Sequence, residues 1–254
     1  MSAAGRRPLI AGNWKMHKTV AEARALIREI RRSDLPRDVD VIVAPPFTAL
    51  SPVHEELHGS HIGLAAQTMH EGTHGAFTGE ISPVMLYDLG VRFVILGHSE
   101  RRLHCGESDA GVNRKVKSAL AHGITPIVAV GETRDEHQAG RTHARVTQQV
   151  RDAFAEVVAP DVARCVVAYE PIWAIGTGLN DEPESANRVI GEIRAAVEGL
   201  QHARLLYGGS MRGDNAAALM AQPNIDGGLI GGASLTAHAF HAVLQAASST
   251  AGAR

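Results

Sequence analysis

Eight short apolar runs, rich in β-branched residues, recur along the 254-residue chain and are separated by segments of helical character. They are Leu9–Ala11, Val39–Ala44, Ile62–Ala65, Val91–Leu96, Ile124–Val130, Cys165–Ala168, Leu205–Tyr207 and Gly228–Ile230. Most of these runs lack the alternation of polar and apolar residues that a half-exposed strand shows. They are therefore typical of parallel strands that are buried on both faces.

The segments between these runs carry signals for the starts and ends of helices. Thr19 and Glu22 form a capping-box pattern at the start of Ala21–Arg32, which has one apolar face. Ser51-Pro52 and Ser82-Pro83 each place a capping hydroxyl before a proline that suits the first helical position. Two later helices are predicted over Glu184–Leu200 and Asp214–Met220, and glycines are predicted to end helices at Gly59, Gly90 and Gly123.

Strands and helices alternate along the whole chain without a long polar linker, which favours a closed (β/α)8 barrel of the α/β class. A single domain is expected over residues 1–254, with an ordered core over about 8–245. An open doubly wound sheet is the structural alternative. Such a sheet usually binds a nucleotide at a glycine-rich first turn, whereas the first run here ends in Asn13-Trp14-Lys15.

The charge and cysteine content argue against nucleic-acid-binding, membrane-binding and disulfide-rich proteins. The chain carries 25 basic and 27 acidic residues, a formal net charge of −2, without a basic stripe. Neither nucleic acid nor a membrane is therefore an expected partner. Cys105 and Cys165 are too few for a disulfide framework and are expected to stay reduced. Because the apolar stretch near the N-terminus is too short for a signal peptide or a span, we expect a cytoplasmic protein.

The residues that follow the predicted strands form a chemically coherent set, and barrels of this kind build active sites at the C-terminal ends of their strands. The set comprises Asn13 and Lys15, Gly97-His98-Ser99-Glu100, Tyr169-Glu170-Pro171, Gly208-Gly209-Ser210 and Gly231-Gly232. Taken singly, Lys15 could be a surface lysine, His98 is one of 14 histidines, and the glycines could be tight turns. Together they place an acid, a base, a cation and two phosphate-sized loops on one face.

These residue types suit proton transfer between adjacent carbons of a hydroxy-carbonyl sugar phosphate. Glu170 is the candidate base, because a carboxylate beside apolar surface is costly unless it is paired or used. His98 and Asn13 are candidate hydrogen-bond donors to the enediolate oxygen that develops. Glycine-rich turns expose backbone N–H groups to a phosphate, and Lys15 adds a positive charge that attracts the anion.

The segment after Glu170 has the composition of a lid over the site. Pro171 stiffens its entry, Ile172-Trp173-Ala174-Ile175 supplies an apolar body, and Gly176-Thr177-Gly178 can present N–H groups to a phosphate. A lid would exclude water from an enediolate phosphate, which otherwise eliminates its phosphate.

Longer motifs run in order from about Pro8 to Phe240. They are Ala11–Met16, Ala66–His70, Gly75–Pro83, Leu96–Arg102, Gly106–Asp109, Ala168–Gly178, Tyr207–Ser210 and Ile225–Leu235. In these motifs the chain closely resembles the triosephosphate isomerase family, whose fold is the TIM barrel. The most specific are His98-Ser99-Glu100-Arg101-Arg102 and the run from Tyr169 to Gly178.

The resemblance implies interconversion of D-glyceraldehyde 3-phosphate and dihydroxyacetone phosphate, without a cofactor or a metal ion. It assigns Glu170 as the proton acceptor and His98 as the electrophile, and this pairing of a glutamate base with a neutral histidine is a well-known case of tuned acid–base chemistry. Asn13 and Lys15 would bind substrate and take part in catalysis. The remaining assignments are Gly176, Ser210, Gly231 and Gly232 to the phosphate, and Ser99 and Glu100 to supporting roles.

The resemblance also implies a homodimer. In such a dimer the loop Gly75–Gly79 enters the active site of the neighbouring subunit, and Thr78 would touch the Asn13–His98 region there. Glu80 and Arg101 are candidates for an ion pair across the interface.

Two positions depart from the family pattern. Ala129 stands near the end of the fifth run, where many members carry a cysteine, and this bears on packing more than on chemistry. Leu179-Asn180-Asp181 stands at the far hinge of the lid, where lysine, a small polar residue and alanine are common. We expect this hinge to alter rates of lid opening rather than to abolish function.

Alternative functions remain open from the sequence. His54-Glu55-Glu56-Leu57-His58 matches the zinc-hydrolase pattern H-E-x-x-H on a predicted helix. Pro52 and Gly59 confine that helix to about two turns, and no third ligand is evident. A nearer alternative keeps the mechanism but acts on a four-carbon ketose phosphate such as erythrulose phosphate. The retained Thr177-Gly178 favours the three-carbon substrate, and the filled catalytic positions argue against a barrel that only binds.

Overall fold

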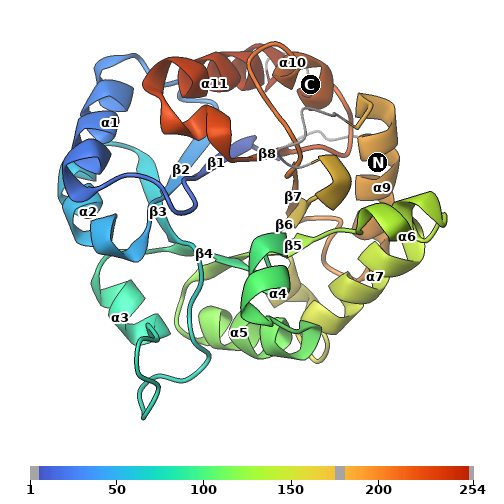
Figure 1. Cartoon of the computed structure of the whole chain (residues 1–254). Helices are drawn as coiled ribbons and strands as arrows, with labels where there is room; N and C mark the ends of the chain where they lie inside the picture. Colours follow the sequence, from blue (N-terminus) through green and yellow to red (C-terminus); the bar gives the residue numbers. More distant parts are fainter. Residues whose placement is uncertain (1–5, 175–180, 252–254) are drawn as a thin grey trace.

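The computed structural model describes residues 6–174 and 181–251, and these form a closed barrel of parallel strands (Figure 1). Each strand pairs with its neighbours in chain order, and β8 closes the ring by pairing with β1. The strands are β1 (Leu9–Asn13), β2 (Asp40–Ala44), β3 (Ile62–Ala66), β4 (Phe93–Leu96), β5 (Thr125–Val130), β6 (Val166–Tyr169), β7 (Arg204–Tyr207) and β8 (Gly227–Ile230). All eight predicted strands are confirmed, with ends that differ by one or two residues.

Helices surround the barrel and connect successive strands (Figure 1). In the described residues the α-helices are α1 (Val20–Arg32), α2 (Leu50–Leu57), α3 (Pro83–Asp88), α4 (Ser99–Cys105), α5 (Asp109–Ala121), α6 (Arg134–Gln138), α7 (Thr142–Ala153), α8 (Ala159–Val162), α9 (Pro183–Ala196), α10 (Ala216–Met220) and α11 (Ala237–Ala251). Short 3-10 turns are η1 (Phe47–Ala49), η2 (Ile172–Ala174) and η3 (Gly232–Leu235). The fold is a single (β/α)8 barrel domain, as predicted, and not an open sheet.

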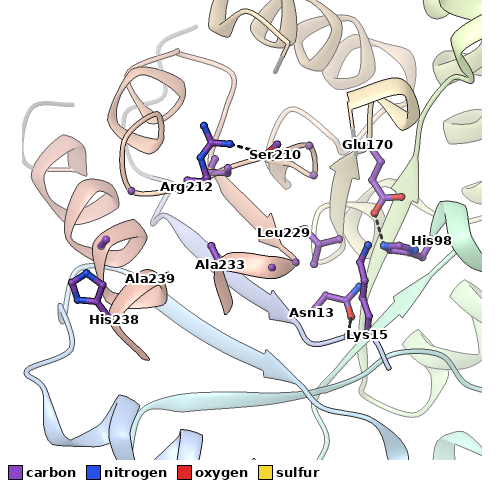
Figure 2. A pocket seen from close by; sticks show the side chains of 17 residues that line it. Asn13, Lys15, His98, Glu170, Ser210, Arg212, Leu229, Ala233, His238 and Ala239 are labelled. Carbon is purple, nitrogen blue, oxygen red and sulfur yellow. Dashed lines mark hydrogen bonds and ion pairs between the residues drawn. The ribbon is translucent and has the colours of Figure 1, made fainter. Parts of the chain in front are cut away.

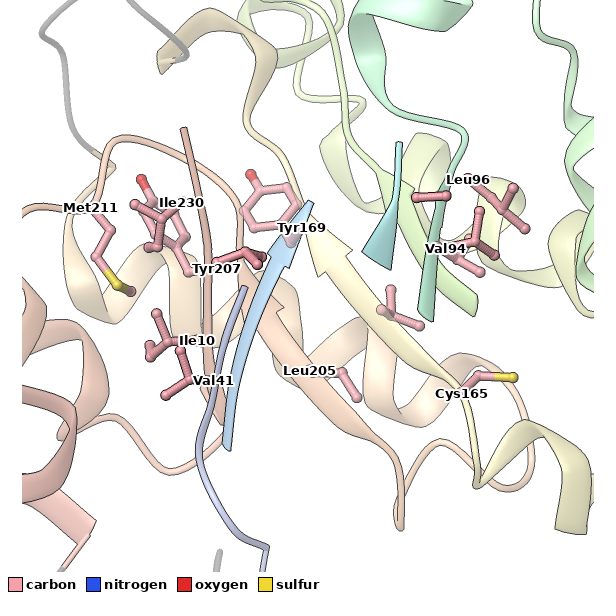
Figure 3. Close-up of a cluster of buried hydrophobic side chains, with 14 of the residues drawn as sticks. Ile10, Val41, Val94, Leu96, Cys165, Tyr169, Leu205, Tyr207, Met211 and Ile230 are labelled. Carbon is pink, nitrogen blue, oxygen red and sulfur yellow. The ribbon is translucent and has the colours of Figure 1, made fainter. Parts of the chain in front are cut away.

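The strands are buried on both faces because two apolar cores lie on either side of the barrel wall. Successive side chains of a strand point to opposite faces, so Leu9 and Ala11 fill the barrel interior while Ile10 packs toward the helices. The interior core consists of Leu9, Ala11, Ile42, Ala44, Ala65, Ile95, Ile127, Val166, Ala168, Leu206 and Leu229. Figure 3 shows part of the larger outer core, including Val41, Val94 and Leu205. This arrangement explains why the strand sequences are continuously apolar.

Most of the helix starts and ends predicted from local sequence signals are confirmed. Thr19 and Glu22 form the predicted capping box, and the hydroxyl of Ser82 accepts from the backbone N–H of Met85 at 3.3 Å. The glycines predicted to end helices have positive φ angles of 75°, 86° and 71° at Gly59, Gly90 and Gly123. The prediction for Ser51 was wrong: η1 leads directly into α2, which begins at Leu50 after the N-cap Ala49.

Two predicted helices are shorter than expected, since α9 ends at Ala196 and α10 begins at Ala216. None of the helices in the described part of the chain combines the length and apolar character needed to cross a membrane.

Candidate active site

The C-terminal ends of the strands open into a hollow of about 590 Å³ that brings together the predicted polar residues (Figure 2). Asn13 ends β1 and Lys15 lies in the turn after it, His98 lies at the β4–α4 junction, and Glu170 follows β6 directly. The turns after β7 and β8 complete the wall. They supply Gly208, Gly209, Ser210, Gly231 and Gly232.

Glu170 and His98 contact each other at the bottom of this hollow. The Nε2 atom of His98 lies 3.1 Å from Oε1 of Glu170, and both side chains are more than nine-tenths buried (Figure 2). The other carboxylate oxygen, Oε2 of Glu170, accepts a hydrogen bond from the backbone N–H of Ser99 at 3.1 Å. Burial of the carboxylate is tolerated because each oxygen has a polar contact.

The hydrogen bonds of His98 define its tautomer. His98 precedes α4 as its N-cap, and its Nδ1 accepts from the backbone N–H of Glu100 at 3.2 Å. A nitrogen that accepts a hydrogen bond carries no proton, so the single proton of the neutral imidazole is on Nε2. Nε2 therefore presents an N–H to the pocket beside Glu170.

Lys15 is held in place by its backbone and by Glu100. Its φ angle of 53° lies in the left-handed region, and its N–H donates to the side-chain oxygen of Asn13 at 3.0 Å. Gln67 supports this turn by donating to the carbonyl oxygens of Lys15 and Ala44 at 2.8 Å and 2.9 Å. The Lys15 ammonium pairs with the Glu100 carboxylate. Partial burial raises the pKa of Glu100, but the hydrogen bond from Lys15 and several smaller electrostatic contributions together outweigh it, so this pKa is lowered overall.

Close packing requires glycine at two of the glycine positions in the wall, Gly208 and Gly209. A Cβ on Gly208 would lie 2.8 Å from Cγ of Glu170, and a Cβ on Gly209 would lie 2.3 Å from the Tyr207 hydroxyl. Gly231 is the N-cap of η3 and Gly232 is its first residue, and both have open space in front of them, apart from Lys15 beside Gly231. At neither position would a side chain meet a close neighbour, so no packing constraint explains these two glycines, which are the kind of residue that glycine-rich anion-binding turns use.

Sequence reasoning missed several residues at this site. Arg212 and His238 line the outer part of the hollow, and Gln67 holds the Lys15 turn. Glu132 is fully buried behind the site, where it accepts a hydrogen bond from the Trp173 indole at 2.8 Å. A charged residue two positions after the fifth strand was the signal that could have identified it.

The lid prediction falls only partly on described residues. Pro171 follows Glu170 directly, and Ile172, Trp173 and Ala174 form the turn η2. Ile175, Gly176, Thr177, Gly178, Leu179 and Asn180 lie outside the described residues. Thr78, predicted to act across a dimer interface, is exposed on the loop between β3 and α3 and does not line the hollow of its own chain.

Comparisons with known proteins agree with this geometry. The profile of the triosephosphate isomerase family matches residues 8–247. The chain belongs to the triosephosphate isomerase family. A triosephosphate isomerase from Chloroflexus aurantiacus is 52% identical over 92% of the chain and 97% of its own length. Those of Carboxydothermus hydrogenoformans and Pelobacter propionicus are 48% and 50% identical, over 94% and 92% of the chain and 98% and 96% of their own lengths.

The H-E-x-x-H match does not form a zinc site of the kind the motif requires. α2 ends at Leu57, so His58 lies beyond the helix, and the carboxylate of Glu55 is paired with Arg24. Among the residues that the structure describes, no group of three or more His, Cys, Asp or Glu side chains could hold a metal ion. The pattern is a coincidence of spacing on an outer helix of a triosephosphate isomerase family barrel.

The family-atypical Ala129 is part of the barrel wall. It is fully buried in β5, and its carbonyl oxygen accepts from Arg102 at 3.3 Å. Its methyl side chain has no reactive or hydrogen-bonding group.

Proposed function

We propose that the protein interconverts D-glyceraldehyde 3-phosphate and dihydroxyacetone phosphate, a step of glycolysis and gluconeogenesis, without a metal ion or cofactor. The observation that carries this proposal is the contact between Glu170 and the Nε2–H of His98 within one buried pocket. Membership of the family supports the same reaction, because its relatives bear the name of that isomerase.

In this proposal, Glu170 moves the proton and His98 stabilises the charge. The Glu170 carboxylate removes a proton from one carbon of the substrate and returns it to the neighbouring carbon. The Nε2–H of His98 donates to the substrate oxygen that becomes negative in the enediolate. The Asn13 amide oxygen is occupied by the N–H of Lys15, which leaves the amide nitrogen as a second donor. Ser99 holds the resting carboxylate through its backbone N–H.

The phosphate is proposed to bind at the opposite wall of the pocket. Gly231, Gly232 and Ser210 line that wall, and Gly176 is assigned to the same role by the family pattern. Backbone N–H groups of glycine-rich turns suit a phosphate because no Cβ blocks the approach. Lys15, between the two halves of the site, supplies the positive charge.

We also propose that the protein acts as a homodimer in the cytoplasm. Several large apolar side chains are strongly exposed, among them Met16, Phe77, Met85 and Leu103, which are 94%, 51%, 56% and 76% exposed. Exposure of this extent is typical of an interface that a partner covers. Figure 1 shows the loop before α3 extending away from the barrel, as a segment that carries Thr78 into a neighbouring subunit would.

Among the residues that the structure describes, the Arg101 side chain makes an ion pair of 3.8 Å with Glu107, and Glu80 is exposed. Both are therefore proposed to pair across the dimer interface. The formal charge of −2 argues against nucleic acid as the partner, and the free cysteines suit a reducing compartment.

The decisive experiment compares wild-type protein with Glu170→Gln on glyceraldehyde 3-phosphate, with erythrulose phosphates assayed in parallel. Glutamine keeps the shape of the side chain but cannot accept the carbon-bound proton, so kcat should fall by about 10²- to 10⁴-fold or more. Glu198→Gln, in an exposed turn after α9, is the matched control and should keep wild-type activity. Activity on a tetrulose phosphate alone would overturn the substrate, and inactivity of the wild type on both would overturn the function.

The dimer is tested by light scattering after size-exclusion chromatography. Wild-type protein is expected at twice the chain mass, and Thr78→Arg is expected at the chain mass with greatly reduced activity. A fully active wild-type monomer would contradict the proposal.

A further inference from the structure

Glu132, the second residue after β5, has polar groups from four other elements around one of its carboxylate oxygens. Oε1 of Glu132 accepts from the Trp173 indole at 2.8 Å, the Tyr169 hydroxyl at 3.2 Å and the Thr142 hydroxyl at 3.3 Å. Nδ1 of His137 lies 3.4 Å from the same oxygen. The carboxylate is fully buried, and such a charge is tolerated only with several polar partners. This cluster therefore holds the residues on either side of the proposed base, Tyr169 and Trp173, against the end of β5.

His137 is the member of this cluster that the proposed mechanism does not use. It lies on the short helix α6, and its ring stacks on the indole of Trp173, with ring centroids 4.4 Å apart and planes at 29°. Its Nδ1 also lies 3.4 Å from the Thr142 hydroxyl. The face of the ring therefore contacts Trp173, while its edge contacts Glu132 and Thr142. The His137 side chain is 43% exposed. It therefore covers the solvent-facing side of the Trp173 indole and limits the movement of the indole toward solvent.

Trp173 is connected to the base by a short and well-anchored segment. The backbone N–H of Glu170 donates to the carbonyl of Val130 at 2.7 Å, and that of Ile172 donates to the carbonyl of Glu132 at 3.2 Å. The end of β5 thus holds the start of this segment, and the Trp173 side chain holds its end. A shift of Trp173 would be transmitted through η2 to Glu170 within three residues.

We propose that His137 is a positioning residue for Glu170, acting by stacking on Trp173 and holding its indole against Glu132. This inference rests on the proposed function for its effect on turnover. His137 does not line the active-site hollow, so it touches no substrate and should affect the chemical step rather than binding. A productive geometry depends on supporting residues of this kind, because a small displacement of a base slows proton transfer strongly.

The test uses three variants of His137 and one control. His137→Ala removes the stack and the polar contact, His137→Gln keeps a polar side chain without a ring, and His137→Phe keeps a ring without the polar nitrogen. His143→Ala is the control, because His143 lies on the neighbouring helix α7 but contacts Glu192 at 3.0 Å instead of Trp173. Steady-state kcat and KM are measured for each variant.

A second readout follows Trp173 directly and needs no turnover. The sequence contains two tryptophans, and Trp14 is fully buried. Quenching of tryptophan fluorescence by acrylamide therefore reports mainly on Trp173. A residue with only a structural role elsewhere would not change the access of acrylamide to this indole.

His137→Ala and His137→Gln are expected to lower kcat by about three- to tenfold, with KM within about twofold of wild type, since one stacked pair of rings is worth about that factor. Both should increase quenching, and His137→Phe should restore kcat and quenching toward wild type. Unchanged kcat and quenching in His137→Ala would overturn the inference, as would an equal loss in His143→Ala. An inactive wild type would instead overturn the proposed function, and the quenching data would still decide whether His137 holds Trp173.

Discussion

The backbone of Gly131 passes so close to Glu170 that position 131 has no room for a side chain. A Cβ there would lie 1.8 Å from the carbonyl oxygen of Glu170 and 2.7 Å from its carbonyl carbon. The N–H of Gly131 donates to the Gln149 side chain at 2.8 Å, so this backbone is also held from behind. The ends of β5 and β6 are therefore locked together at the residue that carries the proposed base.

Gly131→Ala is expected to separate these two strand ends and to displace Glu170. Because the obstacle is backbone rather than a flexible side chain, relief requires a backbone shift, which typically costs about 1–3 kcal/mol in the free energy of unfolding. We expect kcat to fall by at least about tenfold. Urea unfolding and steady-state kinetics measure the two effects.

Gly59→Ala separates a loss of stability from a loss of geometry. Gly59 has a φ of +75°, and a Cβ at this position would have no other residue within 4 Å. Alanine there should therefore cost about 1–2 kcal/mol through backbone strain and leave kcat unchanged. Wild-type kcat in Gly131→Ala would contradict the role assigned to the contact between Gly131 and Glu170.

Lys15→Met is expected to weaken the binding of the anionic substrate. Methionine fills a similar volume but removes the charge that lies between the Glu170–His98 pair and the phosphate turns. A hydrogen bond to a charged group is worth about 1.5–3 kcal/mol, so kcat/KM should fall by about 10- to 100-fold. Inorganic phosphate should also inhibit the variant more weakly. Lys117→Met is the control, because Lys117 pairs with Glu156 on the surface; an equal effect there would count against a local role for Lys15.

The thiol of Cys165 is expected to be unreactive in the folded protein. Burial raises the pKa of the Cys165 thiol to about 12, and its Sγ donates to the carbonyl of Asp161 at 3.2 Å. The thiolate is the reactive species, so little of it is present at neutral or mildly alkaline pH. In a Cys105→Ser variant, a disulfide reagent should detect almost no thiol under native conditions and one per chain in guanidinium. Rapid native labelling would contradict this assignment.

Residues at the ends of strands were predictable because their positions follow from the barrel itself. In a parallel barrel every strand ends on the same side, so Asn13, Lys15, His98 and Glu170 had to lie on one face once the eight strands were recognised. Their mutual contacts then follow from side chains that converge on one hollow. The strands were easy to recognise because each buries one face in the barrel interior and the other against the helices, so its sequence is apolar throughout.

The supporting contacts were not predictable because they join residues that are far apart in sequence. Glu132 meets Trp173, 41 positions away, and Gln67 meets Lys15, 52 positions away. Neither the spacing of residues nor their periodicity in the sequence indicates that such pairs are in contact. Ser51 misled for a different reason: a serine before proline suits a helix start, but the preceding 3-10 turn had already begun the helix at Leu50.

Asp181, the first described residue after the predicted lid, should lower the stability of the folded protein at neutral pH. Its side chain is buried, and burial raises its pKa above the ordinary 3.8, with a further contribution from the negative charge of Glu132; a hydrogen bond from Ser185 and the nearby His137 only partly offset this. A carboxyl with a raised pKa binds its proton more tightly in the folded state than in the unfolded state. Stability is therefore lost as the pH rises from the unfolded pKa through the folded pKa, and the loss then stays constant.

Asp181→Asn removes this titration while keeping the shape of the side chain and an oxygen that accepts from Ser185. The variant should be more stable than wild type at neutral pH, and its advantage should shrink as the pH falls toward about 4, because each tenfold difference in proton affinity between the folded and unfolded states corresponds to about 1.4 kcal/mol. Urea unfolding at several pH values measures the difference in the free energy of unfolding. Asp34→Asn, at an exposed site, is the control and should differ little from wild type. An advantage of Asp181→Asn that grew toward acid pH would reverse the sign of the argument and show that the charged carboxylate is the form that the fold stabilises.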